Sequence, residues 1–215
     1  VRILRRFAEN IGYKSGFSIY DTEDSKTLMK HILKEKNIDT KQVKEKYFLN
    51  QISHLKDELI DPDESEKQYR HGFPDKLVPG IYREYQARLK ANNAFDFDDL
   101  IVKTVELLST DEEVRNYYND RIHYLMVDEY QDTNAAQFEL IRLLTEKRRN
   151  LCVVGDDDQS IYKFRGADIE NILSFEEKFP DAKVIKLEQN YRSYSTILDA
   201  ANAVISNNKG RKDKH

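Results

Sequence analysis

The chain has 215 residues, of which 34% are charged and 39% hydrophobic, and its formal net charge at pH 7 is −4. This length suits one or two domains with a sizeable core, and the high charged fraction predicts long, solvated helices. The negative net charge argues against nucleic-acid binding through bulk positive charge, while a local basic groove stays compatible with it.

The compartment is predicted from what the sequence lacks. A single cysteine, Cys152, excludes an internal disulfide framework and suits a reducing cytoplasm, and we expect it to be buried in a core strand. No apolar run approaches the roughly 20 residues of a membrane span, and no signal peptide is visible. We therefore expect a cytoplasmic protein without membrane contact. Because the chain begins with Val1 and not Met, we expect it to be a piece of a longer protein.

The first part of the chain, residues 1–93, is predicted to be almost wholly helical and has no obvious catalytic cluster. Apolar side chains recur there at helical spacing, with many Lys and Glu between them on solvated faces. The helical stretches are residues 3–11, 28–33, 43–59 and 81–89. Asp24 or Ser25 is expected to cap the second stretch, and residues 61–66 are expected to form an exposed acidic linker.

From Phe95 onward, predicted helices and strands alternate. Asp96 can cap a helix through Asp99. Short apolar runs predict strands, and apolar residues at helical spacing predict helices between and after them. The predicted strands are residues 124–127, 151–154 and 183–187, and helices are predicted from 111, 134, 168 and 195. Strands separated by helices imply right-handed β-α-β units, and so a parallel sheet with buried strands.

Acidic side chains follow the first two predicted strands directly. Asp128 and Glu129 come after the first strand, and residues 156–158 with Gln159 come after the second. The C-terminal edge of an open α/β sheet is where ligands gather. In nucleoside triphosphatases an Asp at this place holds Mg²⁺ on the phosphates, and a neighbouring Glu polarises the attacking water. A plain acidic loop fits poorly, because Gln, Tyr and Arg side chains follow the second strand.

Four motifs in order then identify a family. Residues 127–133 resemble the Walker B motif of superfamily 1 helicases of the UvrD/Rep/PcrA type. Residues 155–167 resemble motif III of that family, and residues 189–193 resemble its motif IV. Residues 95–100 are similar to the segment where the family's chain re-enters the motor domain. Their order and spacing agree with the family, most of all with its PcrA branch, so the resemblance covers the whole chain.

The resemblance implies a role for each site residue and implies ATP and Mg²⁺ as cofactors. Asp128 would coordinate Mg²⁺, and Glu129 would be the general base for water. Gln159 would contact the γ-phosphate and couple its presence to DNA contacts. Arg192 resembles an arginine finger that stabilises charge on the γ-phosphate. Tyr191 would lie against the nucleotide or help to set the cleft between the two motor domains.

The resemblance also implies DNA-binding residues, namely Tyr162, Phe164 and Arg165. Aromatic rings in this loop can stack on bases of any identity, and stacking is typically worth ~1–3 kcal/mol per base. Arg165 would contact phosphate or a neighbouring acid, and the sequence leaves both open. The family often has Trp where this chain has Phe164, and the smaller ring predicts weaker stacking on DNA bases. The implied partners are single-stranded DNA, junctions of single- and double-stranded DNA, and repair or transcription proteins.

The implied fold is α/β, a partial RecA-like P-loop NTPase sheet with an inserted helical subdomain. Residues 1–93 would be this 1B-like subdomain, 94–188 the C-terminal half of motor domain 1A, and 189–215 the start of motor domain 2A. No Gly-x-x-x-x-Gly-Lys-Ser/Thr loop, which would cradle the phosphates, occurs in the sequence. We therefore expect an internal fragment of an ATP-dependent 3′–5′ DNA helicase that cannot hydrolyse ATP alone. We also expect an exposed sheet edge that favours self-association.

Two other hypotheses compete with the helicase fragment. The chain could be a non-enzymatic module that binds DNA or protein through its helical half. It could also be a two-metal nuclease that uses Asp128, Glu129 and residues 156–158, although the usual Lys and spaced acids are not evident. The histidines lack the spacing of metal ligands.

Overall fold

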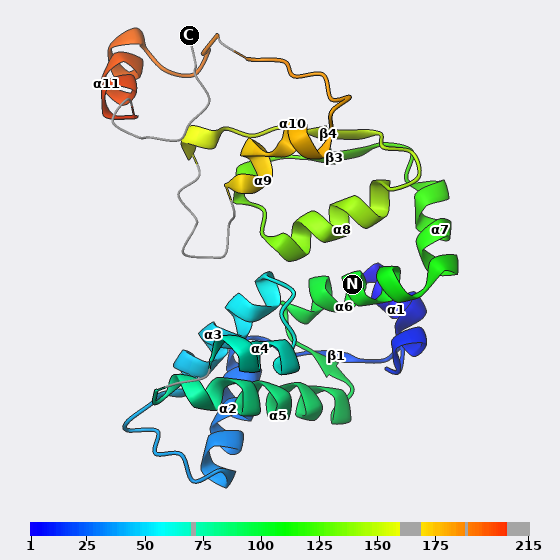
Figure 1. Cartoon of the computed structure of the whole chain (residues 1–215), viewed down its shortest axis with the longest axis vertical. Helices are drawn as coiled ribbons and strands as arrows, with labels where there is room; N and C mark the ends of the chain where they lie inside the picture. The colour runs from blue at the N-terminus through cyan, green and yellow to red at the C-terminus, as the bar shows by residue number, and fades with distance from the viewer. Residues whose placement is uncertain (70–71, 160–168, 188, 206–215) are drawn as a thin grey trace. The chain divides into compact units, whose positions relative to one another are not determined.

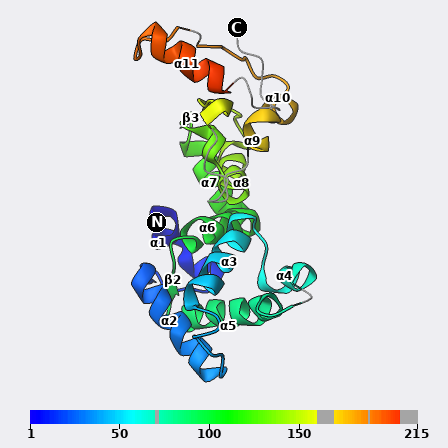
Figure 2. The same ribbon diagram turned by 90° about the vertical axis from the view of Figure 1, so that its left-hand side faces the viewer.

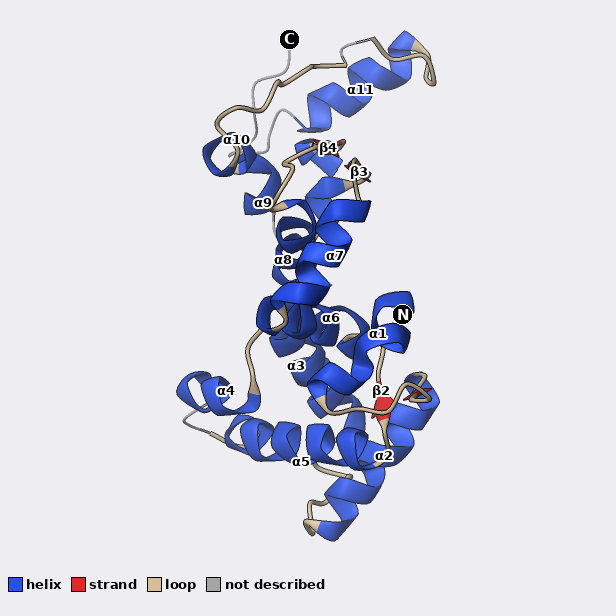
Figure 3. Cartoon of the chain, turned by 90° about the vertical axis from the view of Figure 1, so that its right-hand side faces the viewer, coloured by secondary structure: helices blue, strands red, loops and turns tan. Residues whose placement is uncertain are grey.

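The computed structural model describes residues 1–69, 72–159, 169–187 and 189–205, the side chain of Asp157 excepted. They form a mostly helical α/β fold with two small sheets (Figure 3). The chain divides into two compact units (Figure 1). The first comprises Val1–Leu125 and Asn134–Leu151, and the second Met126–Thr133 and Cys152–His215.

The first unit is helical apart from short strands, as the apolar spacing predicts. Its α-helices are α1 (Arg2–Phe7), α2 (Thr22–Glu35), α3 (Glu45–Asp57), α4 (Pro62–Gln68), α5 (Val78–Ala91), α6 (Asp99–Thr110), α7 (Glu112–Arg121) and α8 (Ala135–Thr145). Its 3₁₀ turns are η1 (Ala8–Ile11) and η2 (Asp75–Leu77). Two strands that the sequence analysis did not predict, β1 (Ser18–Ile19) and β2 (Ala94–Phe95), pair in parallel.

Carboxylate caps fix where two of these helices begin. The side chain of Asp21 accepts the backbone N–H groups of Glu23 and Asp24, at 2.8 and 2.9 Å, and so starts α2. The predicted cap at Asp24 or Ser25 is therefore wrong by three or four residues. Asp61 caps α4 in the same way, with Pro62 in its first turn. The acidic stretch 61–66 is thus largely exposed, as expected, but forms the N-cap and first turns of α4 and not a linker.

Two hydrophobic cores hold the first unit together. In one, α2, α3 and α5 pack on one another (Figure 2). In the other, α1 and η1 pack with α6, α7 and α8. The fully buried members of the first core include Met29, Ile32, Leu33, Phe48, Val78 and Leu89; those of the second include Leu4, Ala8, Phe95, Leu107 and Leu108. Burying so much apolar area is the main force that holds these short helices in place.

A buried ion cluster joins α3 to the start of α6. Lys56 is 1% exposed, and its Nζ lies 2.7 Å from Asp96 and 2.9 Å from Asp99. Asp96 also accepts the backbone N–H of Asp99 at 2.8 Å, the bond that the sequence analysis expects, and the Tyr85 hydroxyl at 3.1 Å. The N-cap residue of α6 is nevertheless Asp98 and not Asp96. Burial alone would lower the pKa of Lys56, but the charges of Asp99 and Asp96 raise it above its ordinary value.

A second polar contact joins α3 to α8. Asn134 and Gln137 form the predicted capping box of α8, with bonds of 2.8 and 3.2 Å. The Asn134 amide also donates to Asp57, at the end of α3, over 2.6 Å. Partial burial and the nearby charge of Asp98 raise the pKa of Asp57 to about 7.

The second sheet contains β3 (Leu125–Val127) and β4 (Leu151–Val153), two of the three predicted strands. The Leu125 N–H donates to the Asn150 carbonyl at 3.0 Å, and the Val154 N–H donates to the Val127 carbonyl at 2.8 Å. Partner residues advance together along both strands, so the pair is parallel. The remaining elements are η3 (Tyr130–Asp132), η4 (Asp157–Gln159), α9 (Glu170–Leu173), α10 (Phe175–Lys178) and α11 (Ser195–Ile205).

Three expectations about this sheet are wrong. Residues 183–187 form no strand, and Leu187 is 86% exposed. Cys152 is exposed and not buried, and Met126 on β3 is 77% exposed. A strand needs neighbouring strands for its backbone hydrogen bonds and a packed layer over its face. Among the described residues, β3 and β4 pair only with each other.

In the described ranges, no helix combines the length and apolar character that crossing a bilayer requires.

Replacing Lys56 with Met should leave the buried Asp96 and Asp99 carboxylates without their cation. We expect the free energy of unfolding, measured by urea denaturation, to fall by about 3–5 kcal/mol. Lys26→Met is the matched control, because Lys26 pairs with Glu23 at the surface, and it should change the value by less than about 0.5 kcal/mol. Adding Asp96→Asn and Asp99→Asn to Lys56→Met should recover part of the loss. An equal, small effect of both lysine variants would contradict a buried ion cluster.

Asp57 should make stability fall as pH rises. Its folded pKa, about 7, lies above the unfolded value near 4, so the folded state holds the proton more tightly. Its contribution is present below about pH 4 and is lost as pH rises to about 7. The stability of Asp57→Asn relative to the unchanged chain should therefore increase between pH 4.5 and 7.5 in denaturation experiments. Asp120→Asn is the control and should show almost no change over this pH range, because Lys147 lowers the pKa of Asp120 and so its effect on stability varies only below about pH 4.

Candidate functional site

The loops after β3 and β4 are tied together where both strands end. The Val154 N–H donates to the carbonyl of Val127, and the Tyr130 N–H donates back to the carbonyl of Val154 at 3.0 Å. Asp128 and Glu129 lie between these two bonds, in the turn that leaves β3. The predicted meeting of the two acidic strand ends at one sheet edge is therefore what the structure shows.

The turn that holds Asp128 and Glu129 has a constrained backbone. Asp128 accepts the N–H of Glu129 on its own carboxylate at 2.9 Å. Glu129 has a φ of 50°, in the left-handed region that side chains with a Cβ rarely adopt. Such conformations persist where surrounding contacts enforce them, and they cluster at functional sites. Both side chains are exposed, so a metal ion or a water molecule can reach the carboxylates.

Beneath the turn, Tyr130 anchors η3 to the helices that follow β4. Tyr130 is fully buried, and its ring meets Phe175 of α10 edge to face, with centroids 5.5 Å apart. Burial raises the pKa of Tyr130 to about 12, so its ring stays neutral. Thr133 donates to the Tyr130 carbonyl at 2.7 Å, and Asn171 of α9 donates to the Thr133 carbonyl at 3.0 Å. The acidic turn is thus supported from one side by packed side chains.

Gln131 connects the two loops through its side chain. Its amide nitrogen donates to Glu129 at 2.9 Å, and its amide oxygen accepts the backbone N–H of Asp156 at 3.0 Å. A Cβ on Gly155 would lie 2.7 Å from this amide oxygen, so glycine is needed there. The sequence analysis gave Gln131 no role, and its place in the Walker B-like segment was the only signal that could have found it.

The loop after β4 positions Gln159, the predicted phosphate sensor. Asp156 accepts the Asp158 N–H at 3.1 Å on one carboxylate oxygen. Its other oxygen accepts the Gln159 side-chain amide at 2.7 Å. Gln159 ends η4 with its side chain exposed, on the loop that Gln131 ties to Glu129. Asp128, Glu129 and Gln159 therefore belong to one connected edge of the sheet.

The other predicted site residues are not joined to this edge. Tyr162, Phe164 and Arg165 lie outside the described residues. Tyr191 is 92% exposed, and Asn190 caps the following turn by accepting the N–H of Arg192 at 2.8 Å. Between described residues, no hydrogen bond, ion pair or ring contact links Tyr191 or Arg192 to the acidic turn. Their roles at the nucleotide stay predictions.

The side chains at this edge suit an Mg²⁺ ion whose other ligands are water and a bound phosphate. Mg²⁺ is usually held by one or two carboxylates together with water and substrate phosphates, and Asp128 presents one exposed carboxylate. No group of three or more His, Cys, Asp or Glu side chains within the described ranges could hold a metal ion on its own. A nuclease that binds two metals therefore gains no support from this part of the chain.

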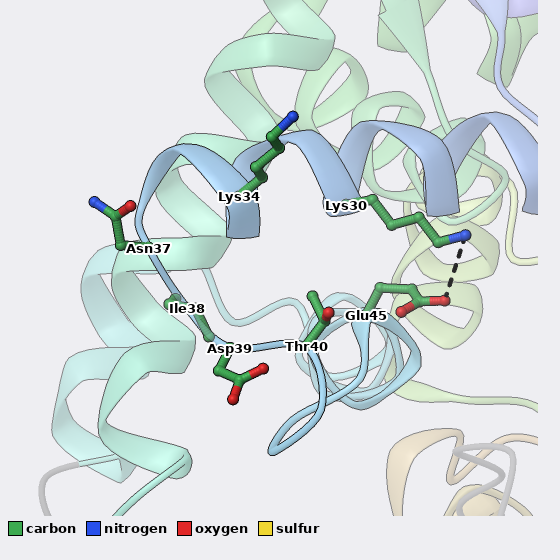
Figure 4. A pocket seen from close by; sticks show the side chains of 7 residues that line it. All are labelled: Lys30, Lys34, Asn37, Ile38, Asp39, Thr40 and Glu45. Carbon is green, nitrogen blue, oxygen red and sulfur yellow. Dashed lines mark ion pairs between the residues drawn. The ribbon is translucent and has the colours of Figure 1, made fainter.

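A hollow of about 500 Å³ opens beside the end of α2 (Figure 4). Its lining residues are Lys30, Lys34, Asn37, Ile38, Asp39, Thr40 and Glu45. Lys30 pairs with Glu45 at 3.9 Å, and the two lysines are matched by two acids. The hollow thus has no excess charge that would select an anion, and we assign it no ligand.

Comparison with known proteins shows the family of this chain. A family model described as the UvrD/REP helicase N-terminal domain matches residues 1–180. The ATP-dependent DNA helicase PcrA of Staphylococcus epidermidis is 51% identical over 214 residues, which are 100% of this chain and 29% of that protein. PcrA of Staphylococcus aureus matches with the same identity and coverage. The chain spans less than a third of the length of these relatives, and by its sequence it belongs to the UvrD/REP helicase family.

Proposed function

We propose that this chain is part of an ATP-dependent DNA helicase that moves 3′ to 5′ along single-stranded DNA and unwinds duplexes ahead of it. The observation that carries the proposal is the connected edge of Asp128, Glu129 and Gln159, where two strand ends meet. Membership of the UvrD/REP helicase family and the similarity to two PcrA helicases support it.

Each predicted residue of the nucleotide site has a role in this proposal. Asp128 helps to hold Mg²⁺, which neutralises charge on the β- and γ-phosphates of ATP. Glu129 accepts a proton from the attacking water, which its exposed carboxylate can reach. Gln159 contacts the γ-phosphate from the neighbouring loop. Arg192 supplies positive charge to the same phosphate, and Tyr191 lies beside the nucleotide.

The DNA-binding part of the proposal rests on the loop that follows Gln159. Tyr162 and Phe164 stack on bases without regard to sequence, and Arg165 contacts a phosphate or an acid. Because residues 162–165 follow Gln159 closely in the sequence, hydrolysis of ATP can change the affinity for DNA. Residues 1–93 would be the inserted 1B-like subdomain, 94–188 the later half of motor domain 1A, and 189–215 the start of 2A.

The 215 residues alone should not turn over ATP, because their sequence has no phosphate loop with its lysine. Mg²⁺-dependent ATP hydrolysis, with and without single-stranded DNA, should appear only in the complete protein encoded by the gene that contains this sequence. There, Glu129→Gln should lower kcat about 10²–10⁴-fold by removing the base. Glu139→Gln is the control, because Glu139 pairs with Arg142 on α8, and its kcat should be unchanged.

Two outcomes would contradict this account. Hydrolysis by the 215-residue chain would show that the phosphate loop is not needed. Absence of DNA-stimulated hydrolysis in the complete protein would favour a module that binds DNA or protein without catalysis.

The aromatic loop should set the affinity for single-stranded DNA. In the complete protein, Phe164→Ala should weaken binding of a fluorescent oligonucleotide by the value of one stacked base, ~1–3 kcal/mol. Phe164→Trp should tighten binding, because a larger ring covers more of a base. Phe73→Ala removes an exposed ring elsewhere and should leave the affinity unchanged. Equal affinities for all three variants would exclude stacking at Phe164.

A further inference from the structure

We propose that Gln131 is a positioning residue that holds the general base and links it to the loop carrying the phosphate sensor. This inference rests on the proposed function, because it assigns Gln131 a part in the same hydrolysis. It concerns the second compact unit alone, to which residues 126–133 and 152–159 belong.

The first step is the geometry of the Gln131 amide. Gln131 is 1% exposed, yet both ends of its amide are satisfied. The nitrogen donates to Oε2 of Glu129 at 2.9 Å, and the oxygen accepts the N–H of Asp156 at 3.0 Å. A buried amide with two such partners has one orientation, since rotation would bring donor to donor and acceptor to acceptor. Gln131 therefore fixes a carboxylate that is itself exposed.

The second step is continuity from the base to the sensor. From Asp156 the path continues through its Oδ2 atom, which accepts the Gln159 amide at 2.7 Å. Glu129 and Gln159 are thus the two ends of one chain of hydrogen bonds, and Gln131 and Asp156 are its middle. The link from Gln131 to Asp156 uses a backbone N–H, so a shift of the loop after β4 must move it.

The third step is the packing that keeps the link short. Gly155 lies against the Gln131 amide, and a Cβ there would also come within 2.9 Å of Ile172 on α9. The backbone at Gly155 is therefore packed closely between the Gln131 amide and Ile172 of α9. Closely packed groups transmit displacement, whereas loosely packed ones would absorb it.

The fourth step is the choice of amide. Only a side chain that donates and accepts at once can serve both partners. The bond to an ionised carboxylate is of the stronger, charge-assisted kind. Between described residues, no donor occupies the other oxygen of Glu129, so that oxygen can receive the water. When Gln159 responds to the γ-phosphate, the same chain of bonds can align Glu129 with that water.

The test measures kcat and KM separately for DNA-stimulated ATP hydrolysis by the complete protein. Gln131→Met keeps the side-chain length and removes both bonds, and we expect kcat to fall about tenfold to a hundredfold, the cost of a misplaced reacting group. KM for ATP should change little. Gln131→Glu keeps the acceptor for the Asp156 N–H but loses the donor to Glu129 and places a second carboxylate beside it, so kcat should fall at least as far as in Gln131→Met.

A matched control and a double variant separate positioning from simple structural support. Gln137→Met removes an amide that caps α8, and its kcat and KM should equal those of the unchanged protein. Gln131→Met combined with Gln159→Met should lower kcat by less than the product of the two single effects, because both break one chain of bonds.

Two patterns of result have different meanings. If Glu129→Gln abolishes hydrolysis but Gln131→Met leaves kcat unchanged, the link through Gln131 is excluded and the proposed function stands. Equal losses of kcat for Gln131→Met and Gln137→Met, or a raised KM without a fall in kcat for Gln131→Met, would also exclude it. If the unchanged protein hydrolyses no ATP, the proposed function itself fails.

Discussion

The backbone pairing of β3 with β4 is the interaction on which the candidate site depends. These strands are separated by α8 in the sequence, and their carboxylates would have no relation to one another without the parallel pairing. Bonds from Val154 to Val127 and from Tyr130 to Val154 carry this pairing beyond the strands themselves and into the loops. The Gln131 amide extends the same connection from backbone to side chains. The candidate site is thus held by two short strands whose ends are joined by backbone and side-chain hydrogen bonds.

Local signals were enough to predict much of this arrangement. A strand that stops at consecutive acids is recognisable because the change from apolar to charged residues is abrupt, and capping boxes such as Asn134 with Gln137 are short-range patterns. The motifs then placed Asp128, Glu129 and Gln159 at one edge. The structure confirms that placement, while the chemical role of each residue stays a prediction.

The sequence could not show features that depend on distant partners. Lys56 lies among lysines and glutamates in a helix that looks solvated, yet its partners Asp96 and Asp99 lie some forty residues away and make it a core residue. The amide of Gln131 carries no local sign that its acceptor oxygen will meet the backbone at Asp156. Cys152 shows the opposite error, because an apolar run predicts burial only where another layer covers it. Residues 183–187 have strand-like composition without a neighbouring strand among the described residues.

The β1–β2 pair places the entry and exit of a long helical excursion side by side, with Ser18 against Ala94 and Ile19 against Phe95. The segment from α2 to α5 is therefore an excursion of the chain that begins and ends at neighbouring positions. Residues can be inserted or substituted within this segment without changing the distance between its two ends. The contacts of Lys56 and Asp57 add two further attachments from α3 to α6 and α8. All three attachments lie near the base of this segment, and Asp96 directly follows β2, so the segment should accept insertions at its far end without loss of these contacts.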